Sequence, residues 1–150
     1  MNRSAEGNGM RRFYEDVKEG QDLPAFVVQN LSRTDLVRYA GASGDFNPIH
    51  HDEEFARMAG NPSVFGHGML TAGFVGKCVS DFVGVENLRR FKVRFATRVW
   101  PGDTITCKGR VTKRYEHDGE KRIDGEVVAL NQKGEVAVSG SFSAALPTRG

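Results

Sequence analysis

The chain is poor in cysteine and has no long apolar run, and each shortage excludes a class of protein. Its 150 residues include two cysteines, Cys78 and Cys107, which lie in apolar segments without the Cys-x-x-Cys spacing of metal and redox sites. We therefore expect buried free thiols and a reducing, cytoplasmic location. Because no stretch of about 18 apolar residues occurs, we expect no membrane-spanning helix.

Neither sign of charge is in large excess. The chain has 21 Lys and Arg against 19 Asp and Glu, a net charge of +2, which gives no reason to expect nucleic acid or a membrane as a partner. One local cluster, Arg89 and Arg90 with Lys92 and Arg94, is open to two interpretations. It is the solvated face of a strand, as charge runs usually are, or a site for a phosphate-bearing ligand.

Several catalytic motifs are also missing. The four histidines show no His-Glu-x-x-His or comparable ligand spacing, so we expect no catalytic metal. There is no Gly-x-Ser-x-Gly turn for a serine nucleophile, and no Gly-x-Gly-x-x-Gly follows a strand, so we expect no dinucleotide cofactor. Residues 1–12 are polar and lack the apolar core of a signal peptide. We expect them to be a disordered lead-in to one domain over residues 13–150.

The composition and the first half of the chain are typical of a globular domain with short helices. The hydrophobic share is 39% and the charged share is 27%, close to the averages for soluble domains. Ser32 and Asp35 are typical of a helix start, and Gly41 or Gly44 is its expected end. A second short helix is expected from Asp52 to Gly60.

The second half predicts an α+β fold. A long buried helix is expected from Met69 to Val83, because apolar residues cover nearly every side of it. Gly73 and Gly76 each weaken such a helix by about 1 kcal/mol, which is easier to understand if something packs closely there. Strands follow near 91–95, 105–117, 122–130 and 136–146, where apolar residues alternate with polar ones. One helix wrapped by one antiparallel sheet leaves apolar surface uncovered, so we expect at least a dimer, with the two sheets joined edge to edge.

The loop Gly44-Asp-Phe-Asn-Pro-Ile-His50 contains an acid and a base between the first two helices. Gly44 and Pro48 pin the loop, and a bend there can bring Asp45 and His50 to one side with room for one water. One group would remove a proton from that water while the other holds or delivers a proton. Asn47 is placed to close the loop through its own backbone bonds. On spacing alone, a loop-capping Asp45 and a structural His50 stay open as the alternative.

A second segment, Phe65-Gly-His-Gly-Met-Leu70, directly precedes the buried helix. Unpaired backbone N–H groups at a helix start favour negative charge, and Gly68 has no side chain to keep a thioester carbonyl away from its N–H. The alternative is an ordinary glycine-rich turn. Combined with the acid–base pair, such a donor would supply what hydration of an α,β-unsaturated thioester needs.

These segments resemble a known family. The stretch from Tyr39 to Ala56 is similar to the signature of the MaoC-like (R)-specific enoyl-CoA hydratases and 3-hydroxyacyl dehydratases, which have the hotdog fold. That signature is an aromatic residue, small residues, Gly-Asp-x-Asn-Pro-aliphatic-His, and a later Ala or Ser. The runs His67-Gly-Met-Leu70 and Trp100-Pro-Gly-Asp103 also resemble the family, and the likeness covers roughly Phe13 to Pro147.

The resemblance implies a single hotdog domain, in which a curved antiparallel sheet wraps a long central helix and two copies form a dimer. It implies that Asp45 and His50 hold the catalytic water and that the Gly68 N–H polarises the thioester carbonyl. Asn47 and His67 would have supporting roles. The substrate would be an acyl-CoA or an acyl carrier protein thioester, and no cofactor would be needed.

Two other functions on this fold stay open. One is a non-catalytic protein that binds acyl thioesters or pairs with a related subunit of a hetero-oligomeric dehydratase, although such a protein has no need of both Asp45 and His50. The other is a thioesterase, which the Gly-Asp-x-Asn-Pro-x-His arrangement makes less favoured. Some family members carry a serine on the buried helix where this chain has Gly76 and Lys77, so the preferred acyl chain stays open. A homodimer is the default, because the acid, the base and the helix start lie on one chain.

Overall fold

The two short helices begin at the side chains that the sequence predicted. In the computed structural model, which describes residues 11–150, Ser32 caps helix α1 (Arg33–Ser43): its Oγ accepts the Asp35 N–H at 3.1 Å, and the Asp35 carboxylate accepts the Ser32 N–H at 2.9 Å. Of the two glycines proposed as its end, the structure uses Gly44, at a φ of 76°. Helix α2 (Glu53–Met58) is capped by Asp52. The predicted lead-in falls mostly on residues 1–10, which lie outside the described residues.

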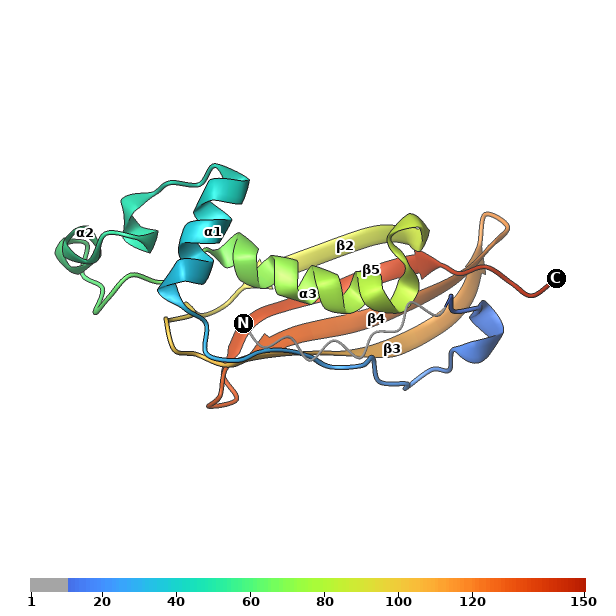
Figure 1. Cartoon of the computed structure of the whole chain (residues 1–150). Coiled ribbons are helices and arrows are strands. Elements are labelled where there is room, and N and C mark those ends of the chain that lie inside the picture. Colours follow the sequence, from blue (N-terminus) through green and yellow to red (C-terminus); the bar gives the residue numbers. More distant parts are fainter. Residues whose placement is uncertain (1–10) are drawn as a thin grey trace.

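Helix α3 (Gly68–Val83) is the long central helix, and the sheet covers only one side of it (Figure 1). Its buried residues are Thr71, Ala72, Phe74, Val75, Cys78, Val79, Phe82 and Val83. On the other side, Met69 is 59% exposed and a side chain at Gly73 would meet nothing within 4 Å. At Gly76 a Cβ atom would lie 3.6 Å from the Phe91 ring of the sheet, as expected for close packing, whereas at Gly73 it would meet no atom of the single chain and packing by an acyl chain stays a prediction. The reason is geometric, because one sheet reaches only the side of the helix that faces it.

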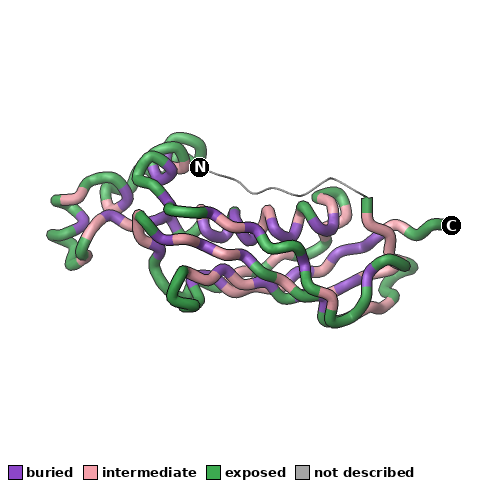
Figure 2. Tube along the Cα trace, turned by 60° about the horizontal axis from the view of Figure 1, so that its bottom comes forward, coloured by how far each residue is buried: buried purple, intermediate pink, exposed green. Residues whose placement is uncertain are grey.

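Five antiparallel strands form the sheet in the order β1-β3-β4-β5-β2. They are β1 (Phe26–Val28), β2 (Leu88–Phe95), β3 (Ile105–His117), β4 (Glu120–Leu130) and β5 (Val136–Ala145). Strands β1 and β2 are the two edges of the sheet, and α1, α2 and α3 all lie between them in the chain. Helix α3 runs along the strands on one face of the sheet (Figure 1). Alternate residues of β3, β4 and β5 point to α3 and are buried (Figure 2), among them Ile105, Ile123 and Phe142. This arrangement is the α+β hotdog that the sequence predicted. The described residues also include three short 3₁₀ helices, Tyr14–Asp16, Pro48–His50 and Val85–Asn87.

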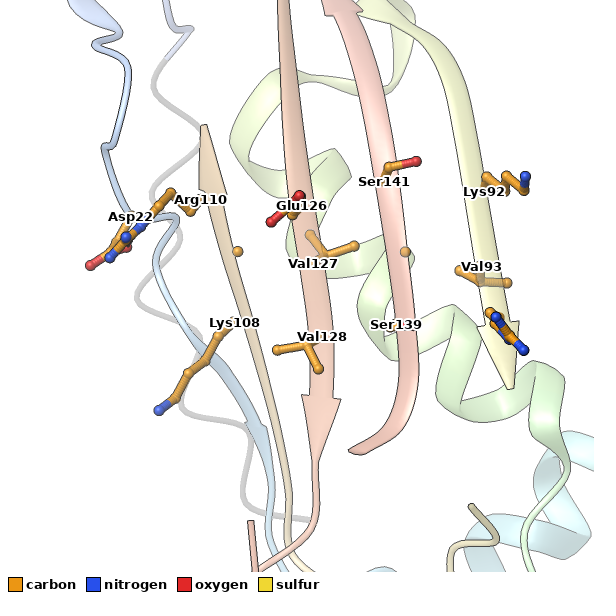
Figure 3. A pocket seen from close by; sticks show the side chains of 13 residues that line it. Asp22, Lys92, Val93, Lys108, Arg110, Glu126, Val127, Val128, Ser139 and Ser141 are labelled. Carbon is orange, nitrogen blue, oxygen red and sulfur yellow. Dashed lines mark hydrogen bonds and ion pairs between the residues drawn. The ribbon is translucent and has the colours of Figure 1, made fainter. Parts of the chain in front are cut away.

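The other face of the sheet carries most of the basic cluster of the sequence. Arg90, Lys92 and Arg94 are exposed there, while their neighbours Phe91 and Val93 pack against the core. A shallow hollow of about 740 Å³ lies on this face. Figure 3 shows Ser139 and Ser141 of β5 in it, between Lys92 of β2 and Lys108 and Arg110 of β3. The exposure of these side chains agrees with the first interpretation, a solvated strand face, and the site for a phosphate-bearing ligand stays a prediction.

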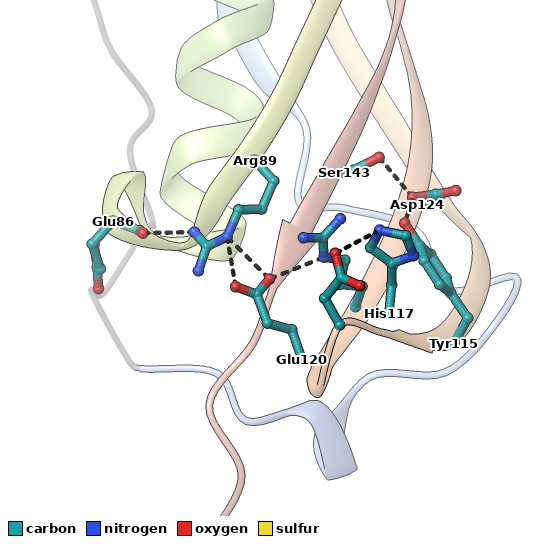
Figure 4. A network of polar contacts seen from close by, with 9 residues as sticks. Glu86, Arg89, Tyr115, His117, Glu120, Asp124 and Ser143 are labelled. Carbon is teal, nitrogen blue, oxygen red and sulfur yellow. Dashed lines mark hydrogen bonds and ion pairs between the residues drawn. The ribbon is translucent and has the colours of Figure 1, made fainter.

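A polar network joins the strands at the end of the sheet far from α1 and α2 (Figures 1 and 4). Arg89 Nε donates to Glu120 at 3.1 and 3.3 Å, and Arg122 Nε donates to the same carboxylate at 2.9 Å. Tyr115 and Ser143 both donate to one oxygen of Asp124 at 2.7 Å. Because these bonds join Arg89 of β2 and Ser143 of β5 to residues of β3 and β4, the network holds the β3–β4 hairpin to β2 and β5.

The two cysteines lie inside the fold. Cys78 on α3 and Cys107 on β3 are buried and free, as predicted. Burial raises the pKa of the Cys78 thiol to about 11 and that of Cys107 to about 12, so both stay protonated at neutral pH. No helix within residues 11–150 is long and apolar enough to cross a membrane.

Candidate active site

Short-range hydrogen bonds fix the loop that carries the predicted acid and base. After Gly44 ends α1, the Asn47 N–H donates to Asp45 Oδ1 at 3.3 Å, and Asn47 Oδ1 accepts the Ile49 N–H at 3.1 Å. Pro48 then begins the 3₁₀ turn that ends at His50. Asn47 thus closes the loop in the way the sequence predicted, and Asp45 and His50 come to the same side.

The acid and the base face each other across a gap. His50 Nε2 lies 3.9 Å from Asp45 Oδ2, and His50 Nδ1 lies 2.7 Å from the carbonyl oxygen of Phe65. Because a carbonyl only accepts, Nδ1 of the neutral ring carries the proton and Nε2 carries the lone pair that faces Asp45. A direct hydrogen bond does not span this gap, and the distance is short enough for one water molecule to contact both atoms at about 2.8 Å.

His67 completes the cluster from the other segment. Its ring is buried and stacks on His50, with centroids 3.8 Å apart and an interplanar angle of 26°. Its Nε2 donates to the carbonyl oxygen of Asp45 at 3.1 Å, and the Tyr39 ring packs against it with centroids 4.8 Å apart. The two histidines therefore link the loop of residues 44–50 to the segment of residues 65–70, because each donates to a backbone carbonyl of the other segment. Within residues 11–150, Nδ1 of His67 has no hydrogen-bond partner.

Asp45, His50 and His67 also bring three potential metal-ligand atoms within 4.8 Å of one another. A metal ion would need the imidazole lone pairs to converge on one point at about 2.0–2.1 Å from each nitrogen. In two nearly parallel stacked rings the lone pairs run side by side, and one nitrogen of each ring already donates to a carbonyl. The geometry suits a water between an acid and a base better than a cation.

Gly68 is the first residue of α3, as the sequence predicted, and it lines a pocket of about 530 Å³. Its N–H has no acceptor among the residues that the structure describes. A Cβ atom at this position would lie 3.1 Å from the Phe95 ring, so any other residue here would require that ring to shift. Other pocket-lining residues include Phe65, Thr71, Arg98, Trp100 and Val138.

Phe65 connects this pocket to the acid–base pair. Its ring lines the pocket and also packs edge-on against His50, with centroids 5.3 Å apart at 81°. The structure brings Asp45 and His50 together and places Gly68, one residue after His67, next to this pair. Asp45 and His50 do not themselves line the pocket. Sequence reasoning did not single out Phe65 or Arg98. The only signal was their position next to the Gly-His-Gly and Trp-Pro-Gly-Asp runs.

Comparison with known proteins identifies the family. A family described as the MaoC like domain matches residues 16–133 of the chain. The chain belongs to this family. Among curated proteins, the MaoC-like chain is 30% identical over 141 residues to an (R)-specific enoyl-CoA hydratase of Rhodospirillum rubrum, covering 92% of this chain and 94% of that protein.

Solved structures agree on the fold of this MaoC-like chain. It superposes with a TM-score of 0.79 and 22% identity on an unliganded R-hydratase from Pseudomonas aeruginosa, covering 91% of this chain and 86% of the other. It also superposes on a chain of the ChsH1-ChsH2 complex from Mycobacterium tuberculosis, with a TM-score of 0.74 and 27% identity over 87% of this chain and 98% of that one. The hotdog architecture thus recurs in relatives with quite different sequences.

The buried His67 predicts a pH dependence of stability. Burial lowers the pKa of His67 in the folded chain, where it faces His50, His51, Asp45 and Tyr39. Its contribution to stability is therefore complete above the ordinary histidine pKa of about 6.5, and it is lost as the pH falls through the lowered value. We expect the free energy of unfolding to fall by at most about 1.4 kcal/mol per pH unit from this residue.

Thermal unfolding at a series of pH values tests this expectation with two variants. His67→Gln cannot titrate, so its stability should fall less steeply than that of the wild type as the pH is lowered below about 6.5. His117→Gln is the control, because it removes an exposed histidine of the β3–β4 hairpin whose ion pair is with Asp118 and not with the cluster around His67. An identical slope in the wild type and His67→Gln would contradict the prediction.

Proposed function

We propose that the chain adds water across the double bond of a trans-2-enoyl thioester, and removes it in reverse, giving an (R)-3-hydroxyacyl thioester. The observation that carries the proposal is the 3.9 Å gap between Asp45 Oδ2 and His50 Nε2, two atoms that can each accept a hydrogen bond from the same water. The (R)-specific enoyl-CoA hydratase of Rhodospirillum rubrum, similar over nearly its whole length, supports the same reaction.

The proposed mechanism assigns one task to each group. The water between Asp45 and His50 gives a proton to one of them as its oxygen forms a bond to C3 of the substrate. The electrons of the C2–C3 bond shift toward the thioester oxygen, where the Gly68 N–H stabilises the enolate. C2 then takes a proton from the acid–base pair, so one water has been added and the pair returns to its starting state. Asn47 and His67 position the two catalytic side chains.

The substrate carrier in this proposal is CoA or an acyl carrier protein, and the working form is a homodimer. The outer edge of β2 and the exposed side of α3 at Met69 and Gly73 support a second copy, because both leave surface that one chain does not cover. A second candidate is one subunit of a two-protein dehydratase. The likeness to a chain of the ChsH1-ChsH2 complex favours it, and equilibrium sedimentation of the purified chain distinguishes a self-dimer from a partner-dependent monomer.

Purified protein and crotonyl-CoA test the reaction. We expect the enoyl-thioester absorbance to fall with time as the double bond is hydrated, and chiral chromatography to identify the product as (R)-3-hydroxybutanoyl-CoA. A thiol reagent in a parallel reaction measures released CoA. If thiol appears while the 3-hydroxyacyl product does not, the chain is a thioesterase. If crotonyl-CoA and its carrier protein form both stay unchanged at several acyl lengths, the hydratase proposal is wrong.

A further inference from the structure

Arg98 stands at the wall of the pocket that also contains Gly68. It lies in the loop between β2 and β3, and its side chain is exposed. The guanidinium carbon lies 5.0 Å from the centre of the Phe65 ring, on which it rests as a cation on a π face. Because the same Phe65 ring packs edge-on against His50, one aromatic side chain separates Arg98 from the proposed catalytic base.

The backbone on both sides of Arg98 is anchored. Thr97 Oγ1 donates to the carbonyl oxygen of Val136 at 2.8 Å, which ties the loop to β5. On the other side, the carbonyl oxygen of Val99 accepts the Gly66 N–H at 2.7 Å, which ties the loop to the segment that precedes Gly68. The backbone at Arg98 is therefore held in place relative to the segment that carries Gly68, and a preorganised site loses less entropy on binding.

The charge of Arg98 is not neutralised inside the chain. Within residues 11–150, no carboxylate forms an ion pair with it. Glu135, the one acidic side chain in the pocket wall, instead accepts a hydrogen bond from Asn131 Nδ2 at 3.0 Å. The other residues of the wall are uncharged, so Arg98 is the one cationic side chain that an anion entering this pocket meets, against the single carboxylate of Glu135.

We infer that Arg98 is the anion-recognition residue of the substrate pocket and binds an anionic group of the thioester. This inference rests on the proposed function for the position of the thioester at Gly68. Two parts of such a substrate carry that chemistry: a carboxylate on the acyl chain, or a phosphate of the carrier. Both pair with the flat guanidinium through two N–H donors, which a lysine ammonium does not reproduce.

Trp100 gives a direct readout of binding. It is the only tryptophan of the chain and lines the same pocket, so a ligand there changes the intrinsic fluorescence. Saturated thioesters are the probes, because they have no double bond to hydrate and report affinity alone. Butanoyl-CoA carries the phosphates, butanoyl-pantetheine lacks them, and succinyl-CoA carries both the phosphates and an acyl carboxylate.

We expect Arg98→Gln to weaken binding by about tenfold or more, the size of one lost charge-assisted contact. If the partner is a phosphate, the loss appears with both CoA thioesters and is absent with butanoyl-pantetheine. If it is an acyl carboxylate, only succinyl-CoA is affected. Arg98→Lys should recover part of the lost affinity. Arg94→Gln is the matched control, since Arg94 is also exposed and unpaired but lies on the opposite face of the sheet.

Three results would overturn the inference. They are unchanged affinity for all three thioesters in Arg98→Gln, an equal loss for all three including butanoyl-pantetheine, or the same loss in Arg94→Gln. The assay also separates this inference from the proposed function. Crotonyl-CoA hydration with unchanged affinities in Arg98→Gln leaves the function standing without the anion site. If the wild type hydrates nothing while Arg98→Gln selectively loses affinity for the anionic thioesters, the proposed function fails and the chain is an anion-recognising thioester-binding protein.

Discussion

Replacing Asp45 by Asn should lower kcat for crotonyl-CoA hydration by about 10²–10⁴-fold, the usual contribution of one acid–base group. The amide keeps the size of the carboxylate, and its oxygen can still accept the Asn47 N–H that closes the loop. What it loses is the negative charge and the ability to take a proton at the atom that lies 3.9 Å from His50 Nε2. Asp45 is half exposed, so we expect the melting temperature to stay close to that of the wild type.

The measurement is the initial rate of crotonyl-CoA hydration at saturating substrate, with a melting curve on the same preparation. Asp22→Asn is the matched control, because Asp22 is an equally small exposed carboxylate that pairs with Arg110 on the other face of the sheet. We expect its rate to equal that of the wild type. Wild-type turnover in Asp45→Asn would show that Asp45 takes no part in the chemistry and would remove the observation on which the proposed function depends.

The parts of the site that could be predicted from the sequence are those built by short-range contacts. The capping of α1 by Ser32 and Asp35, its end at Gly44, and the loop closed by Asn47 all involve residues within four positions of each other. Their side-chain chemistry alone determines the local backbone conformation. Consequently the facing arrangement of the acid and the base was predictable, although the roles of both groups await the rate measurements.

The parts that could not be predicted depend on residues far apart in the chain. His67 stacks on His50, and Arg98 packs on the Phe65 ring. Both contacts join segments that are separated by loops, and no local sequence pattern determines the path of those loops. The same limit applies to Gly73, where the sheet does not reach the helix. Composition showed that α3 is apolar around most of its circumference, but only the path of the sheet decides which side of the helix is covered.

The largest effect on stability is expected from Gly125→Ala. Gly125 of β4 pairs with Phe142 of β5 on the face of the sheet that packs against α3. A Cβ atom at Gly125 would lie 2.3 Å from the Phe142 ring and 2.8 Å from the carbonyl oxygen of Arg110. The ring is 2% exposed, so it has no free space to move into, and the backbone oxygen belongs to the neighbouring strand. Overpacking of this kind typically costs about 1–3 kcal/mol and sometimes more.

Gly41→Ala is the same chemical change as Gly125→Ala, but we expect it to raise the stability of the fold instead of lowering it. Gly41 lies inside α1, and a Cβ there would meet nothing within 4 Å. Alanine favours the helix by about 1 kcal/mol over glycine, so this variant should be slightly more stable than the wild type. Chemical denaturation of the three proteins measures both shifts, with Gly125→Ala unfolding at lower denaturant and Gly41→Ala at higher. Equal stability of Gly125→Ala and the wild type would mean that β4 and β5 can separate enough to admit a methyl group. The register that places Phe142 beneath α3 would then be looser than the structure shows.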